Sequence, residues 1–167
     1  MKTALVIIDM QKDFVDYACD KKVSGVYLRK IESICHAIRA AKKHGWTIVV
    51  VEYEGYGYTI DPIVEAIGKY RKVRVVTKCI DNGSDELGPL LKRLKIQRVV
   101  YTGCNSDACV FATVKEMVQY EMPKVRHQVY IPGTMTFNST TIRANSPDAI
   151  RGYLMSRDIP SISRLVA

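Results

Sequence analysis

Three polar residues and one short segment directly follow apolar, β-branched runs, and these positions are the candidates for chemistry. Asp9, Glu52 and Lys78 each come at the end of such a run, and residues 103–109 follow a fourth run. In folds built from parallel strands and helices, catalytic groups gather at the carboxyl ends of the strands. An acid, a cation and a thiol at one edge of a sheet could together support proton transfer and nucleophilic attack.

Cys109 is the strongest candidate, because in the stretch YTGCNSDACVFATVKEM it stands where a glycine-containing loop is followed by a helical pattern. Unpaired N–H groups at a helix N-terminus stabilise a thiolate and lower the thiol pKa. The same groups can bind the negatively charged oxygen of a tetrahedral intermediate. The sequence therefore indicates a nucleophilic cysteine, with a small buried side chain as the alternative.

Asp9 and Lys78 each allow two interpretations when taken alone. The Asp9 carboxylate could act as a general base, or it could orient the loop that follows it. The Lys78 ammonium could serve the site, or it could extend to solvent as most lysines do.

The hydrophobic pattern predicts the elements that would position these residues. Continuous apolar runs are typical of strands covered on both faces, and apolar residues at helical spacing lie between them. The predicted strands are residues 4–8, 47–51, 73–77, 98–102, 125–131 and 159–166. One predicted helix spans residues 27–43, and four more are expected to begin at Asp61-Pro62, at Ser84, near Cys109 and at Ser146-Pro147. A loop is expected after the first strand. This alternation predicts an α/β fold with a parallel sheet, and no repeat or linker divides residues 1–167, so we expect a single domain.

Length and composition exclude several classes of protein. The chain has 167 residues, of which 47% are hydrophobic and 25% charged, which excludes fibrous and disordered chains. No apolar run approaches the ~20 residues that span a bilayer, and the first residues lack the features of a signal peptide, so a cytoplasmic protein without membrane partners is expected. Five cysteines, an odd number, fit reduced thiols better than a disulfide framework.

The net charge of +8 bears on the choice of partner. A positive field favours an anionic substrate. The sequence contains no zinc finger and no basic tract interleaved with aromatics, so no nucleic-acid partner is expected.

Three segments, MKTALVIIDMQKDF, the lysine of VVTK, and GCNSDACV, resemble the signature segments of the isochorismatase-like cysteine hydrolases. That superfamily includes nicotinamidases, N-carbamoylsarcosine amidases, maleamate and ureidoacrylate amidohydrolases, and isochorismatases. The segments occur in the family's order, from the first predicted strand to the helix after the fourth. The resemblance implies a three-layer Rossmann-like fold with a six-stranded, mainly parallel sheet in the order 3-2-1-4-5-6 and helices on both faces.

The resemblance also implies a set of site residues. Asp9, Lys78 and Cys109 would form a catalytic triad, with the lysine reaching across the second strand. The backbone N–H groups of Asn105 and Cys109 would form the oxyanion hole. A cis peptide bond is implied between Cys104 and Asn105.

The implied reaction is hydrolysis of a C–N bond in a small amide, carbamoyl or imide-like molecule through an acyl-enzyme. Isochorismatase proper cleaves a vinyl ether without a thiol nucleophile, so the presence of Cys109 favours amide chemistry. The alternative is a catalytically silent member that binds a small molecule or a protein. A thiol-redox protein using Cys104 and Cys109 is disfavoured, because the sequence has no CxxC motif. Relatives commonly form dimers or tetramers, so a homodimer or homotetramer is expected.

The sequence departs from the nicotinamidases after the second predicted strand. Those enzymes carry an Asp-x-His metal motif there, whereas VVVEYEGYGYTID has Glu52 and Glu54 and no histidine. Transition-metal sites draw on imidazole or thiolate ligands. We therefore expect no metal and no cofactor, which argues against nicotinamidase activity.

Aromatic side chains are the candidates for substrate contact. Phe14 matches a position that often lines the pocket in the family. Tyr53, Tyr56 and Tyr58 in the loop 53–58 could stack on a planar substrate, or they could be ordinary surface aromatics. No role is predicted for residues 132–146, where many relatives carry an acid that this sequence lacks.

Overall fold

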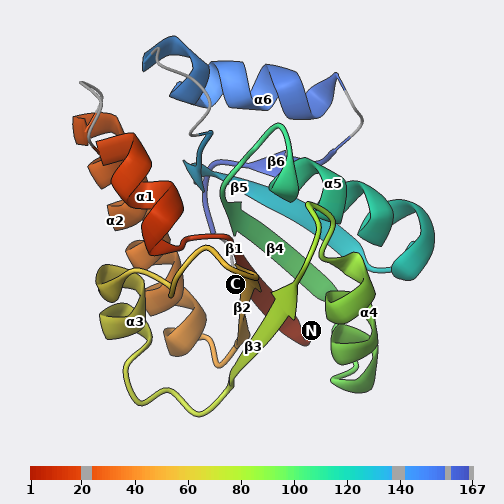
Figure 1. Cartoon of the computed structure of the whole chain (residues 1–167). Helices are drawn as coiled ribbons and strands as arrows, with labels where there is room; N and C mark the ends of the chain where they lie inside the picture. The colour runs from red at the N-terminus through yellow and green to blue at the C-terminus, as the bar shows by residue number, and fades with distance from the viewer. Residues whose placement is uncertain (20–23, 137–141, 157–158, 166–167) are drawn as a thin grey trace.

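The centre of the molecule is a sheet of six parallel strands in the order β3-β2-β1-β4-β5-β6 (Figure 1). The computed structural model describes residues 1–19, 24–136, 142–156 and 159–165. The strands are β1 (Thr3–Ile8), β2 (Thr47–Tyr53), β3 (Val73–Lys78), β4 (Arg98–Gly103), β5 (Arg126–Thr134) and β6 (Ser161–Ile162). The strand order and the parallel arrangement confirm the predicted fold, and they place β1 and β4 side by side at the point where the order reverses.

Helices cover both faces of this sheet (Figure 1). They are α1 (Lys12–Cys19), α2 (Ser24–Lys43), α3 (Asp61–Ile67), α4 (Ser84–Arg93), α5 (Cys109–Glu116) and α6 (Pro147–Met155). A π-helical turn, Met117–Glu121, continues α5, and a 3-10 turn, Ile142–Asn145, precedes α6. Helices α1, α2 and α3 lie on one face of the sheet, and α4 and α5 lie on the other. The result is a three-layer arrangement.

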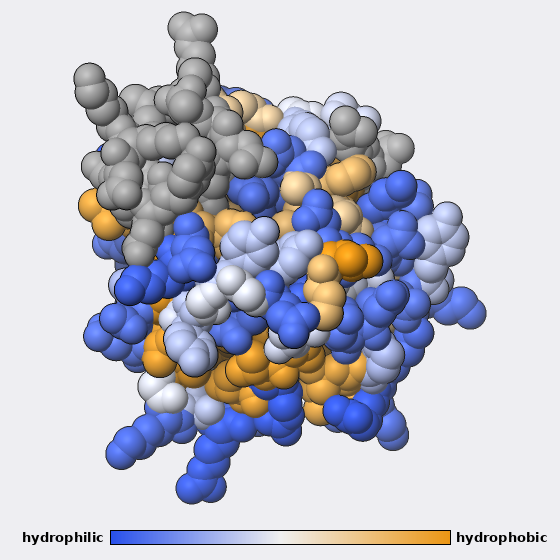
Figure 2. Space-filling view, viewed as in Figure 1, coloured by the Kyte–Doolittle hydropathy of each residue, from blue (hydrophilic) through white to orange (hydrophobic). Residues whose placement is uncertain are grey.

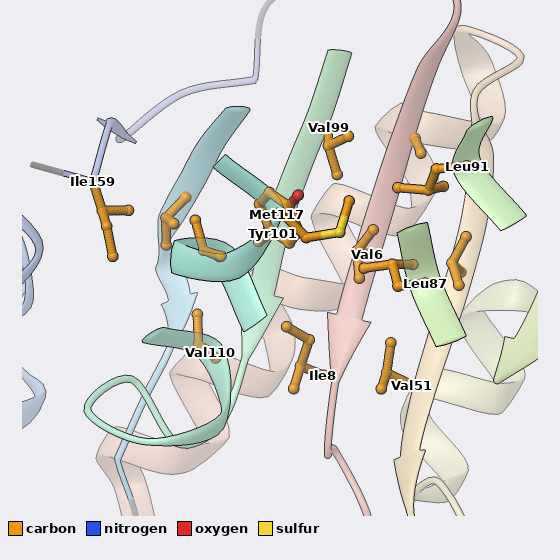
Figure 3. Close-up of a cluster of buried hydrophobic side chains, with 14 of the residues drawn as sticks. Val6, Ile8, Val51, Leu87, Leu91, Val99, Tyr101, Val110, Met117 and Ile159 are labelled. Carbon is orange, nitrogen blue, oxygen red and sulfur yellow. The ribbon is translucent and has the colours of Figure 1, made fainter. Parts of the chain in front are cut away.

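The central strand β1 shows why its apolar residues are continuous rather than alternating. All six residues of β1 are buried. Leu5 and Ile7 pack in the core beneath α2 and α3, while Val6 and Ile8 pack in the core beneath α4 and α5. Figure 3 shows this second core, in which Val6 and Ile8 lie with Leu87 of α4. Because successive side chains point to opposite faces, a strand between two helical layers has to be apolar at every position.

The edge strand β3 is the least covered of the long strands. Buried and exposed residues do not alternate regularly along this strand, and Val75 is exposed. Figure 2 shows hydrophobic side chains at the surface in the lower half of the view, where Figure 1 places β3. Only Lys78, at the carboxyl end of the strand, is fully buried. Burial of a lysine at the end of an otherwise exposed strand marks it as a residue held by specific partners.

The structure corrects several predicted element boundaries. Residues 12–19 form α1 instead of a loop, because Val15 and Phe14 give this charged segment one apolar face that packs on the core. Helix α3 begins at Asp61 itself, with Ile60 as the preceding cap. Ser84 is the first residue of α4 rather than its cap, whereas the predicted Ser146 cap of α6 is confirmed by its bond from the Ala149 N–H.

The last predicted strand is much shorter than expected. Instead of residues 159–166, only Ser161–Ile162 pair with β5. Residues 166–167 lie outside the described residues. None of the helices in the described ranges combines the length and the hydropathy that crossing a bilayer requires.

Candidate active site

Asp9 is the first residue after β1, and its side chain is completely buried. Its backbone has a φ of +52°, a left-handed conformation that aspartate tolerates better than most residues. The Asp9 N–H donates to the Val51 carbonyl at 2.9 Å, which ties the residue to the neighbouring strand β2. The carboxylate is therefore held below the surface at the carboxyl edge of the sheet.

Lys78 reaches Asp9 from two strands away. In the sheet register Lys78 pairs with Tyr53 of β2, and its ammonium crosses that strand to lie 2.9 Å from Asp9 Oδ2. Both side chains are fully buried. Lys78 Nζ also donates to the carbonyls of Ile80 and Asp81, at 3.0 and 3.2 Å, and lies 3.9 Å from the centre of the Tyr53 ring. The buried ammonium is thus stabilised by the Asp9 carboxylate, two backbone carbonyls and the face of the Tyr53 ring.

Cys109 is the first residue of α5, and only 3% of it is exposed. Its thiol donates to Asp81 Oδ1 at 3.6 Å, and it lies close enough to the Asp9 carboxyl for that group to raise the thiol pKa. The Cys109 N–H is among the first amides of α5, which have no acceptor within the helix. The structure thus brings Asp9, Lys78 and Cys109 into one contiguous cluster.

The loop before α5 is fixed against β1. A cis peptide bond joins Cys104 and Asn105, at the position named from the sequence. Cys104 is buried, and its thiol donates to the Asp9 carbonyl at 2.9 Å. The Asn105 carbonyl accepts the N–H groups of Ala108 and Val110, at 3.2 and 2.9 Å. These bonds hold Asn105 and the start of α5 in a fixed relation.

Gly103 is required where β4 meets this loop. Its φ is +116°, and a Cβ at this position would collide with the Ile8 carbonyl of the adjacent strand. Glycine alone permits both the backbone conformation and the close approach of β4 to β1. This approach places the Cys109 loop next to Asp9.

The prediction that the Cys109 thiol pKa is lowered is wrong. Burial, followed by the charge of Asp9, raises the pKa of Cys109 to about 12, and Lys78 offsets only part of this effect. Burial likewise raises the pKa of Asp9, although the Lys78 charge and the hydrogen bond from Cys109 act in the opposite direction. The uncharged form of the thiol is therefore stabilised, with its proton next to a carboxylate that can accept it.

Asp81 is a functional candidate that the sequence reasoning missed. It is an exposed residue in the turn between β3 and α4. Its Oδ1 atom lies 3.6 Å from the Cys109 sulfur. Its charge adds to those that raise the pKa values of Asp9, Cys109 and Tyr53. An acid in a surface turn carries no periodic signal, so only its position three residues after Lys78 could have pointed to it.

Phe14 and Tyr53, the two residues expected to contact substrate, lie next to each other. The Phe14 ring stacks on Tyr56, with ring centres 4.4 Å apart, and meets Tyr53 edge-on at 6.5 Å. Tyr58 does not belong to this group of rings and is 86% exposed. Buried Gln11 fixes the loop, because its side-chain amide bonds the Tyr53 N–H at 2.6 Å, the Tyr53 carbonyl at 2.9 Å and the Gly57 carbonyl at 2.7 Å.

The acids that follow β2 do not form a metal site. Glu52 Oε1 accepts the Thr59 N–H and hydroxyl, at 3.0 and 2.6 Å. Glu54 Oε2 accepts the Cys79 thiol at 3.0 Å. Within the described ranges, no three His, Cys, Asp or Glu side chains are grouped so that they could hold an ion. The metal implied by the nicotinamidase relatives therefore does not fit the donors at this position.

The segment after β5 supports the Cys109 loop from the other side. The Met135 carbonyl accepts the Ser106 N–H at 2.8 Å, and the Thr136 hydroxyl donates to Asp107 at 2.8 Å. Asn145 bonds both backbone groups of Thr136. Of the segment 132–146, residues 137–141 lie outside the described residues.

Comparison with known proteins places this geometry in context. The sequence matches the family description "Isochorismatase domain" over residues 3–125. No curated protein matches the sequence. The fold is similar to that of a nicotinamidase from Staphylococcus aureus, with a TM-score of 0.75, 18% identity, and 99% of each chain covered.

Two further solved structures share the fold. An N-carbamoylsarcosine amidase from Thermoplasma acidophilum has a TM-score of 0.73 and 17% identity, and both chains are fully covered. The MAR1 ribonuclease from Caenorhabditis elegans has a TM-score of 0.71 and 16% identity, with 95% of this chain and 75% of that chain covered. Proteins with different stated activities thus share this architecture, and the activity has to be argued from the site.

Proposed function

Because this chain belongs to the isochorismatase domain family, we propose that it is a hydrolase that cleaves the C–N bond of a small amide, carbamoyl or imide-like molecule through Cys109. The observation that supports this proposal is the cluster in which the Cys109 thiol lies near the buried Asp9 carboxylate, which is itself paired with the buried Lys78 ammonium at 2.9 Å. A nucleophile, its proton acceptor and a group that fixes the acceptor's charge are the three parts that acyl transfer by a thiol needs.

The first half of the reaction forms an acyl-enzyme. Asp9 takes the proton from the Cys109 thiol as the sulfur attacks the carbonyl carbon, so no free thiolate has to accumulate. The negative charge that develops on the carbonyl oxygen is bound by the N–H groups of Asn105 and Cys109. Asp9 then passes the proton to the leaving nitrogen, the C–N bond breaks, and ammonia or an amine departs.

The second half returns the enzyme to its starting state. Asp9, again a carboxylate, takes a proton from a water molecule that attacks the Cys109 thioester. The carboxylic acid product leaves as the C–S bond breaks, and the sulfur regains the proton from Asp9. Lys78 stays charged throughout and keeps Asp9 able to give up its proton, because its ammonium favours the ionised carboxylate. This cycle uses the side chains of the cluster, the backbone N–H groups of Asn105 and Cys109 and one water molecule, and none of its steps involves a metal.

The proposal is tested by measuring ammonia release from a panel of small primary amides, carbamoyl compounds and cyclic imides. We expect Cys109→Ala and Asp9→Asn to lose at least about 10³-fold in rate. Cys79→Ala is the matched control, because Cys79 is an exposed thiol outside the cluster and its loss should leave the rate unchanged. A Cys109→Ala protein that still releases ammonia at the original rate would contradict the proposal.

A further inference from the structure

The charge next to Cys109 is opposite in sign to that of the whole chain. The chain has a net charge of +8, yet the group 3.6 Å from the Cys109 sulfur is the Asp81 carboxylate. The nearest cation, Lys78, already forms the buried ion pair with Asp9. Among the described residues, the ion pairs do not include Asp81, whose carboxylate instead accepts the Cys109 thiol at 3.6 Å.

Asp81 is held in this place by the turn that contains it. Its backbone carbonyl accepts the Lys78 ammonium at 3.2 Å. Two residues later, the Gly83 N–H donates to the Thr113 hydroxyl of α5 at 3.0 Å, and the Asn82 side chain accepts the Ser84 N–H at 2.9 Å. The turn is thus tied to both β3 and α5. Asp81 is exposed while Cys109 is buried, so of these two neighbouring groups the carboxylate is the one open to solvent.

Electron-rich rings lie at the same edge of the sheet. Tyr53 is close enough to Asp81 for that carboxylate to raise the tyrosine pKa, with burial as the larger cause. Tyr56 meets Tyr53 edge-on, with ring centres 5.0 Å apart, and stacks on Phe14. Aromatic faces attract cations, and the Tyr53 ring already holds the Lys78 ammonium 3.9 Å from its centre. A further ammonium or guanidinium group would be attracted by the Asp81 carboxylate, with the tyrosine rings beside it.

We infer that Asp81 determines substrate specificity and selects substrates that carry a positive charge near the scissile amide. This inference rests on the proposed function and names its substrate class: amides or carbamoyl compounds that also bear an ammonium, quaternary ammonium or guanidinium group. It reverses the expectation of an anionic substrate, because the charge 3.6 Å from the sulfur outweighs a positive charge spread over the distant surface.

Binding of such a cation would also prepare the nucleophile. After burial and Asp9, the Asp81 charge is the smallest of the causes that raise the pKa of the Cys109 thiol. A cation placed against Asp81 neutralises that charge, so the thiol gives up its proton more readily once the substrate is bound. Specificity and activation are then consequences of the same contact.

The inference is tested without knowledge of the substrate by comparing two thiol reagents of equal reach and opposite charge. These are 2-(trimethylammonium)ethyl methanethiosulfonate and 2-sulfonatoethyl methanethiosulfonate, and labelling of Cys109 is followed by peptide mass spectrometry. Cys79 is replaced by alanine in all proteins, because its exposed thiol would consume reagent. Each rate is divided by the rate of a free thiol with the same reagent.

We expect the normalised preference for the cationic reagent to fall about tenfold in Asp81→Asn at low salt. Asp81→Lys should reverse the preference, which separates an effect of charge from an effect of side-chain packing. Asp85→Asn is the matched control, since it removes an exposed acid from the first turn of α4 without touching Cys109, and the ratio should not change.

An unchanged ratio in Asp81→Asn, an equal fall in Asp85→Asn, or a Cys109 that neither reagent reaches would overturn the inference. Failure of the proposed function is read separately, from ammonia release that persists in Cys109→Ala. If ammonia release requires Cys109 but the ratio of the two labelling rates does not change in the Asp81 variants, only the inferred charge specificity is wrong.

Discussion

Replacing Lys78 by methionine tests how the buried ion pair holds the site together. Methionine keeps most of the side-chain volume but removes the charge that lies 2.9 Å from Asp9 Oδ2. At an effective dielectric constant of about 20, two unit charges at this separation attract by about 6 kcal/mol. Part of this attraction offsets the cost of removing both groups from water, so the net loss on removing one partner should be about 3–5 kcal/mol.

The loss should depend on pH in a defined direction. Burial already raises the Asp9 pKa above its ordinary value of 3.8, and without Lys78 it rises further. A folded state that binds the proton more tightly than the unfolded state becomes less stable as pH rises through this interval. The Lys78→Met protein should therefore be most destabilised at neutral pH and should recover part of its stability as the pH falls and Asp9 becomes protonated.

Urea denaturation of four proteins at pH 7 and at pH 5 measures this effect: the natural protein, Lys78→Met, Asp9→Asn and the double variant. The bonds from Lys78 to Ile80 and Asp81 are lost in both proteins that lack the lysine, so the cycle isolates its interaction with Asp9. The double variant should be more stable than the sum of the single losses predicts. Simple additivity at pH 7, or a Lys78→Met loss below about 1 kcal/mol, would refute the reasoning.

Three further predictions concern the nucleophile, the loop before it and the loop beside it. Because the Cys109 pKa is raised to about 12, the rate of Cys109 alkylation by iodoacetamide should increase about tenfold per pH unit between pH 7 and 9. A rate that levels off near pH 7 would show that Cys109 is already a thiolate. In urea titrations, Gly103→Ala should lower the free energy of unfolding by more than about 3 kcal/mol. Gly152→Ala, where an added Cβ meets no atom within 4 Å, should raise it by about 0.5–1 kcal/mol. Equal effects of the two substitutions would contradict the strain argument. Gln11→Met should lower the free energy of unfolding by about 1–3 kcal/mol and increase hydrogen exchange at Gly57, because buried backbone groups lose their partners. Unchanged exchange would show that the loop does not depend on this side chain.

The sheet and the main cluster were predictable from the sequence for a physical reason. A strand with helices on both faces has to be apolar throughout, so the run before Asp9 marks both the strand and the place where it ends. Parallel strands end at the same edge, and the strand order that the resemblance implied puts β1 beside β4, which brings Asp9 and the Cys109 loop together. The long reach of Lys78 followed from the resemblance, since a lysine at a strand end otherwise extends to solvent.

Other features depend on packing that the sequence does not display. Helix α1 was missed because the lysine and two aspartates in residues 12–19 were taken as a sign of a loop, whereas Phe14 and Val15 pack on the core. The contact of Asp81 with Cys109 depends on how a turn after β3 packs against α5, which no local pattern encodes. The raised thiol pKa was missed because a helix N-terminus was weighed without the burial that accompanies it.

The central claim is that Cys109 forms a covalent acyl intermediate during hydrolysis. The most direct measurement mixes the protein with an amide that supports ammonia release, quenches it with acid within the first turnover, and maps the added mass by peptide mass spectrometry. The account predicts an acyl group on the peptide that contains Cys109, and none in Cys109→Ala. Continued ammonia release by Cys109→Ala, or an acyl group carried by a different residue, would contradict it.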